Sequence, residues 1–158
     1  MTNTLATRAG FTPRGLQVVA GYARGLNIAQ VAVELGIAER TVASHTHLAA
    51  KALGIRGARQ AALVDYAYRH GYLTVDQPRR RPALTPRLEQ VLDCAARGLS
   101  AQATAAELGI ANRTARRHLE RLRGALDVHT TARAVAVAWE TGLRGRPSAP
   151  RTTRGETN

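Results

Sequence analysis

The sequence is poor in cysteine, and it lacks both long apolar runs and the residue groups of common active sites. Cys94 is the one cysteine, so the chain can form no internal disulfide and no thiolate-rich metal site. No apolar run approaches the roughly 20 residues of a membrane span, and none near the N-terminus is long enough for a signal peptide. A carboxylate pair, a nucleophile triad and a phosphate loop are missing as well. These absences predict an intracellular, cytoplasmic protein with no cofactor, no metal and no enzymatic activity.

Negative charge is also scarce. The chain has 11 Asp and Glu against 23 Lys and Arg, a net charge of +12, and Lys51 is its only lysine. Heavy Arg and Ala usage also fits a GC-rich genome, so the preference for Arg over Lys is not taken as functional. The excess itself favours a polyanionic partner, most commonly nucleic acid, over a merely solvated basic surface. With 44% hydrophobic and 22% charged residues, the composition is typical of a globular protein.

The sequence repeats itself once. "FTPRGLQVVAGYARGLNIAQVAVELGIAERTVASH" from Phe11 aligns with "LTPRLEQVLDCAARGLSAQATAAELGIANRTARRH" from Leu84. The match weakens after Leu53 and Leu126, where the first copy carries two extra residues near "RGARQ". Each copy is therefore predicted to form one small unit of about 60 residues, and an isolated domain of this size is only marginally stable.

Helix boundaries can be placed in both copies. N-capping residues precede the first and second helices: Thr12, Thr85, Asn27 and Ser100. Glycines end the same helices: Gly25, Gly98, Gly36 and Gly109. Third helices are predicted from Glu39 to about Leu53 and from Asn112 to about Leu126. Inward positions recur along them at helical spacing: Val42, Thr46, Ala49, Leu53, Ala115, Leu119, Leu122 and Leu126.

Fourth helices, "QAALVDYAYRHG" and "RAVAVAWETG", complete each unit. The fold class is therefore all-α, with two tandem four-helix helix-turn-helix domains. We predict an N-terminal tail at 1–10, domains at 11–73 and 84–143, an Arg/Pro linker at 74–83, and a disordered basic tail at 144–158.

The motif "LTPR…VL…A.RGLSA…AAELGIA.RT…H", followed by a helix ending in "GL", occurs in both copies. It resembles the GerE-like C-terminal DNA-binding domain of LuxR-type transcription regulators. The C-terminal domain of sigma factors shares part of the pattern, but the fourth helix and the histidine favour the LuxR-like family. The resemblance implies DNA contacts from both third helices: Arg40, Thr41, Ala43, Ser44, His45, His47 and Lys51, then Arg113, Thr114, Arg116, Arg117, His118, Glu120 and Arg123.

The two copies differ most where bases would be read. Arg116 and Arg117 can each bind guanine through two hydrogen bonds, whereas Ala43 can pack on a thymine methyl group and Ser44 is permissive. Two unequal half-sites are therefore expected, with a G-containing one for the second unit. Glu120 can accept from cytosine, or can hold the two arginines in place, and we favour the second role.

Some positions depart from the family pattern. Ala38 and Ala111 replace a capping serine, a loss of about 1 kcal/mol of helix stability in each unit. Ala115 replaces a valine, and Thr46 replaces an apolar residue. One unit can therefore be a degenerate copy kept for packing, and the first is the more suspect. The family histidines, His45 and His118, are more often structural or phosphate-contacting than catalytic.

Aromatic residues gather in the fourth helices, which in the LuxR-like family commonly form the dimer contact. They are candidates for an interface: Tyr66, Tyr68, Tyr72 and Trp139. If the fourth helices meet, the chain is an intramolecular pseudo-dimer for an inverted repeat; otherwise the units lie along a direct repeat, and a homodimer is a further arrangement. The linker residues Arg79, Arg80 and Arg81 can follow phosphates or enter a minor groove, or can simply add solubilising charge.

The sequence therefore predicts a bacterial, nucleoid-associated transcription regulator that binds double-stranded DNA sequence-specifically. The alternative is a protein-interaction or architectural module that acts on RNA polymerase or another regulator, or coats DNA without choosing sequence. The operator, the regulated genes, the direction of regulation and its control are not specified by the sequence.

Overall fold

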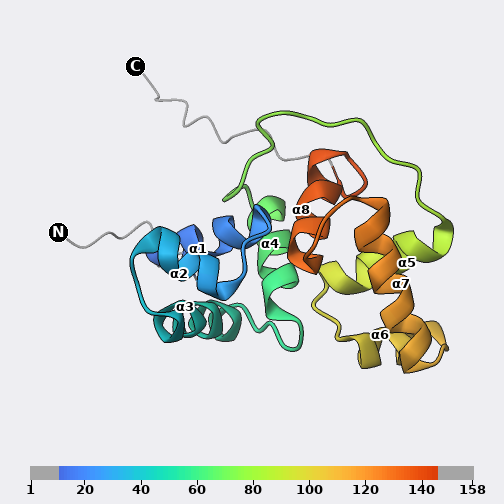
Figure 1. Cartoon of the computed structure of the whole chain (residues 1–158), viewed down its shortest axis with the longest axis horizontal. Helices are drawn as coiled ribbons and strands as arrows, with labels where there is room; N and C mark the ends of the chain where they lie inside the picture. The colour runs from blue at the N-terminus through green and yellow to red at the C-terminus, as the bar shows by residue number, and fades with distance from the viewer. Residues whose placement is uncertain (1–10, 146–158) are drawn as a thin grey trace, which may run out of the picture.

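A computed structural model describes residues 11–145, and this part of the chain is all-helical, as predicted (Figure 1). The N-terminal tail and the predicted disordered tail from residue 146 onward lie outside the described residues. The first unit contains α1 (Pro13–Ala23), α2 (Ile28–Leu35), α3 (Glu39–Ala52) and α4 (Arg59–Arg69). The second contains α5 (Pro86–Ala96), α6 (Ala101–Leu108), α7 (Asn112–Ala125) and α8 (Thr131–Glu140).

The predicted caps are confirmed at both ends of the short helices. Thr12, Thr85, Asn27 and Ser100 each accept a backbone N–H of the first turn with their side chain. Gly36 and Gly109 adopt the left-handed conformation, both with φ of 65°, and thereby close the turn that leads into the third helix. The local sequence of each copy therefore determines the geometry of the turn in its helix-turn-helix.

The third helices start without a side-chain cap. Ala38 and Ala111 occupy the N-cap positions of α3 and α7 in extended conformation, and neither can accept a hydrogen bond from the first turn. We expect Ala38→Ser and Ala111→Ser each to raise the free energy of unfolding by about 0.5–1 kcal/mol. Chemical denaturation of the single and double variants checks this, and unchanged midpoints would show that water already satisfies these N–H groups.

The cores of the two units are packed differently at one pair of aligned positions. In the first unit Tyr22 is fully buried, and its hydroxyl donates to Thr46 Oγ1 over 2.7 Å while Thr46 donates to the carbonyl of Val42. The second unit has Ala95 and Leu119 at these places. The threonine on the inward face is therefore the partner of a buried tyrosine, and the second unit fills the same space with a small and a large apolar residue.

The two units pack against each other through their fourth helices. α4 and α8 lie side by side in the centre of the molecule, α1 contacts α8, and α5 contacts α4 (Figure 1). The end of each first helix likewise contacts the fourth helix of the other unit. Gly25 lies against Arg133 of α8, and Gly98, its aligned counterpart, lies against Ala62 of α4. Such reciprocal contacts are those of a two-fold arrangement.

The close approach at Gly98 is made possible by a second glycine. Ala58 N donates to Gly98 O over 2.8 Å, and a Cβ on Gly57 would lie only 2.5 Å from that oxygen. Gly57 also has a φ of 82°, which L side chains rarely adopt. The turn before α4 therefore tolerates only glycine at this point, and the two backbones meet directly.

Candidate nucleic-acid interface

The predicted DNA-contacting residues of the first unit lie along one exposed face of α3. Arg40, Ala43, His47 and Lys51 recur every three or four residues on this face, opposite the buried Val42, Thr46 and Ala49. His45 is half-buried, and Thr41 and Ser44 are exposed. The Ser44 hydroxyl donates to Arg40 O over 3.0 Å. Because the opposite face of α3 packs into the core, the predicted DNA-contacting residues face outward.

The equivalent face of α7 is far more basic. Arg113, Thr114, Arg116 and Arg117 are exposed, while Ala115 and Leu122 behind them are fully buried. None of these three arginines forms an ion pair or hydrogen bond with another side chain in residues 11–145. Their guanidinium groups are therefore available to an outside acceptor.

Glu120, Arg123 and His118 complete the predicted set on α7. Glu120 is exposed and makes no ion pair with Arg116 or Arg117 in the described part of the chain, and its bracing role stays a prediction. Arg123 is half-buried and donates to Thr131 Oγ1 over 3.2 Å, which ties α7 to the start of α8. His118 is half-buried, like its counterpart His45.

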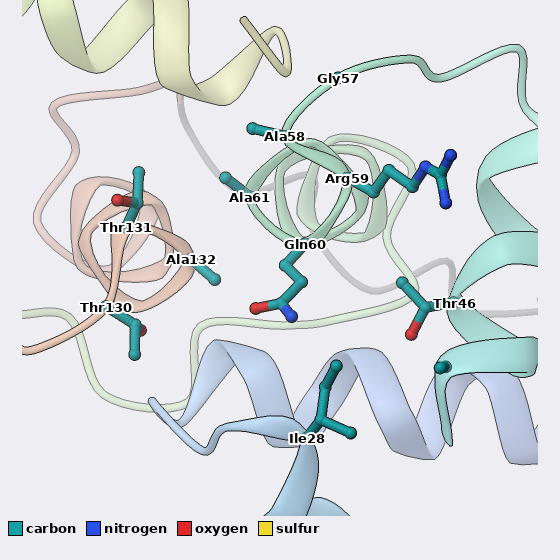
Figure 2. A pocket seen from close by; sticks show the side chains of 11 residues that line it. Ile28, Thr46, Gly57, Ala58, Arg59, Gln60, Ala61, Thr130, Thr131 and Ala132 are labelled. Carbon is teal, nitrogen blue, oxygen red and sulfur yellow. The ribbon is translucent and has the colours of Figure 1, made fainter. Parts of the chain in front are cut away.

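A hollow of about 500 Å³ lies next to Ala43, between α3 and the first residues of α4 and α8. Residues 57–61 form one wall and residues 130–132 form another, so both units contribute to it. Gln60 points into this space, whereas the Arg59 side chain extends out of it towards α3 (Figure 2). Ala43, which is predicted to face a base, therefore borders the junction of the two units.

The centre of the junction is a buried cluster around Asp65, which sequence reasoning missed. Asp65 is 3% exposed, and its Oδ1 accepts from Trp139 Nε1 at 2.8 Å and from Arg144 Nε at 2.7 Å. Arg69 donates to the other oxygen at 2.8 Å. The available signal was the single carboxylate inside the apolar run "AALVDYAY", because a buried charge requires partners.

Of the four aromatic residues expected at an interface, two meet across the junction. Tyr68 and Trp139, which are aligned positions of the repeat, stack with ring centroids 6.0 Å apart and an interplanar angle of 11°. A residue that touches its own counterpart lies next to the two-fold axis. Tyr66 and Tyr72 instead pack edge-on against Phe11 of their own unit.

Arg144 and two of the three linker arginines form ion pairs, and the predicted DNA contacts of the linker stay predictions. Arg144, expected at the start of the disordered tail, is largely buried and bridges Asp65 to Asp93. Arg79 pairs with Glu140 at 3.3 Å, and Arg81 lies 3.8 Å from Glu89, so both tie the linker to the second unit. Arg80 is exposed. The linker passes along the top edge in Figure 1, whereas α3 and α6 lie along the bottom edge.

Cys94 lies beneath an exposed ion pair of the second unit. It is 1% exposed, and its Sγ donates to Glu107 over 3.0 Å, while Glu107 also pairs with Arg97. Burial, and then the Glu107 carboxylate, raise the pKa of this thiol to about 11. Because only the thiolate is nucleophilic, we expect no reaction with a thiol reagent at pH 8 until the protein is denatured. Rapid labelling of the native protein would contradict this placement.

Both units match the same protein family. The family described as bacterial regulatory proteins of the luxR family matches residues 9–64 and, separately, residues 82–138, which together make up most of the chain. The chain belongs to the LuxR family. Each match spans one complete helix-turn-helix and continues into the fourth helix of its unit, covering about half of α4 and most of α8. No curated protein and no solved structure gave a significant match.

LuxR-family helix-turn-helix domains are DNA-binding domains of regulators, and this chain carries two of them. Among residues 11–145, no helix is both long and apolar enough to cross a membrane. The same residues hold no group of three His, Cys, Asp or Glu side chains placed to bind a metal ion. The exposed faces of α3 and α7 are therefore the candidate functional surfaces of this LuxR-family chain.

Proposed function

We propose that this LuxR-family chain is a transcription regulator that binds double-stranded DNA sequence-specifically through α3 and α7. The observation that carries the proposal is the face of α7, where Arg113, Arg116 and Arg117 are exposed and free of internal ion pairs within residues 11–145. Such arginines bind phosphates and guanine edges. The nucleoid is the corresponding place of action.

The packing of α4 on α8 supports binding as a single chain. Because Tyr68 stacks on its counterpart Trp139 and the first helices contact the opposite fourth helices, the two recognition helices are related by an approximate two-fold axis. Two-fold helix-turn-helix proteins bind half-sites of inverted orientation. The proposed target is therefore an imperfect inverted repeat bound by one chain, without a separate dimerisation step.

The two half-sites are proposed to be unequal. Arg116 and Arg117 favour guanine, and the aligned Ala43 and Ser44 of α3 offer a methyl contact and a permissive hydroxyl. The shared residues of the repeat thus build the same scaffold twice, and the residues that differ on the exposed faces of α3 and α7 are the ones proposed to read bases.

Selection of bound duplexes from a random library tests the proposal. We expect enrichment of a two-part motif with inverted, unequal halves, and a complex of one chain per duplex by mass measurement. A direct repeat would contradict the two-fold arrangement. Salt-sensitive binding without an enriched motif would favour an architectural role, and no DNA binding at all would favour a module for RNA polymerase or another regulator.

A further inference from the structure

A second basic surface lies in the first unit, beside the C-terminal half of α3. It is a hollow of about 260 Å³ between α3 and the turn that leads into α4. Four of its lining side chains are basic, and none is acidic: His47, Lys51, Arg56 and Arg59. All four are exposed, and we call this set the basic hollow.

The basic hollow is continuous with the recognition face of α3. His47 and Lys51 lie one turn apart on that face, and Arg59 Nη1 reaches within 3.3 Å of His47 Nδ1. Neither Lys51 nor Arg56 pairs with a carboxylate in the described part of the chain. Basic side chains gathered in this way repel one another, and an anion placed between them would relieve the repulsion.

The two extra residues of the first copy fall in the turn that forms this hollow. The aligned turn of the second unit contains Asp127, Val128, His129 and Thr130 and has no arginine. The recognition helices show the opposite distribution, because α7 has Arg116, Arg117 and Arg121 where α3 has Ala43, Ser44 and Leu48. Positive charge therefore lies along the middle of α7 in the second unit, and at the C-terminal end of α3 in the first unit.

From this distribution we propose that the first unit serves mainly as a backbone clamp. Lys51, Arg56 and Arg59 bind consecutive phosphates of the DNA backbone in the basic hollow, while α7 supplies most of the base discrimination. This inference rests on the proposed DNA binding, and it assigns different tasks to the two units. Phosphate contacts fix position and carry no sequence information directly, which fits the small side chains at the base-facing positions of α3.

Salt dependence of binding tests the clamp. The triple variant K51Q/R56Q/R59Q should bind its best duplex and a random duplex more weakly by the same factor. The slope of log affinity against log salt concentration should become shallower by about 2–3, close to one for each phosphate that the variant no longer neutralises. The motif selected from a random library should stay the same, because the variant keeps Ala43, Ser44 and all of α7.

Arg69→Gln is the control, because it removes one positive charge, where the triple variant removes three, from the other end of α4 and should leave the slope unchanged. Arg69 also pairs with Asp65, so the stability of this variant is measured beside its binding. Thermal unfolding of each variant shows whether it is folded. An unchanged slope in a folded triple variant, or loss of one half of the selected motif, overturns the clamp and leaves the proposed function standing. A wild-type chain that does not bind duplex DNA overturns both.

Discussion

Replacing Arg116 and Arg117 together with lysine is expected to remove most of the preference for the selected motif while preserving affinity for random duplex. Lysine keeps the positive charge of each exposed side chain but replaces the rigid planar fork of a guanidinium group, which matches guanine O6 and N7, with a flexible ammonium group that selects guanine less strongly. Each such pair is worth about 1–3 kcal/mol of discrimination, so the double variant should lose roughly 30-fold or more in specificity. Titration of the best duplex and a random duplex at the same salt concentration measures the ratio.

Arg121→Lys is the control for this experiment, because Arg121 is exposed on the same helix and is not proposed to contact a base. It should change the ratio little. If the double lysine variant keeps its specificity, the proposal that these two arginines make bidentate contacts to guanine is wrong. If both duplexes lose affinity equally, the two arginines bind phosphates.

Removing the carboxylate of Asp65 is expected to destabilise the whole described structure. Asp65→Ala leaves Trp139 Nε1 and the largely buried Arg144 guanidinium without their acceptor at the junction of the units. Breaking a buried charge pair in this way costs about 3–5 kcal/mol. For a chain of this size the melting temperature should fall by about 10 °C or more. The fluorescence of Trp139, the only tryptophan, should change with it.

Asp93→Ala provides the comparison, because Asp93 also pairs with Arg144 but is half-exposed. Its loss should lower stability by at most about 1 kcal/mol. Equal melting temperatures of the two variants would show that the buried cluster does not hold the two units together. Two separate unfolding transitions in Asp65→Ala alone would show that the cluster makes unfolding cooperative between the units.

Much of the fold follows from local sequence. Thr12 and Thr85 before proline, Asn27 and Ser100, and the glycines at 36 and 109 specify helix ends through contacts within three or four residues. The inward faces of α3 and α7 follow equally from helical spacing. Such features are predictable because each depends on neighbours along the chain.

The junction could not be derived in the same way. Asp65 meets Trp139 and Arg144, residues more than 70 positions away, and the sequence does not state which distant donors a buried carboxylate finds. Arg144 lies next to a stretch of Gly, Pro and Ser, and its composition favoured a tail. Likewise, Thr46 is anomalous on an apolar face until Tyr22 is placed above it. The basic hollow was missed because Arg56 and Arg59 lie outside the helix-turn-helix motif.

The two units belong to one chain, and this changes how a mutation affects the recognition faces. In a symmetric homodimer every substitution in a recognition helix alters both halves of the target at once, so the two halves must evolve together. In this chain, a substitution in α7 leaves the sequence of α3 unchanged. In the proposed complex, substitutions can therefore change the preference for one half of the target at a time, while the other unit keeps its contacts with DNA.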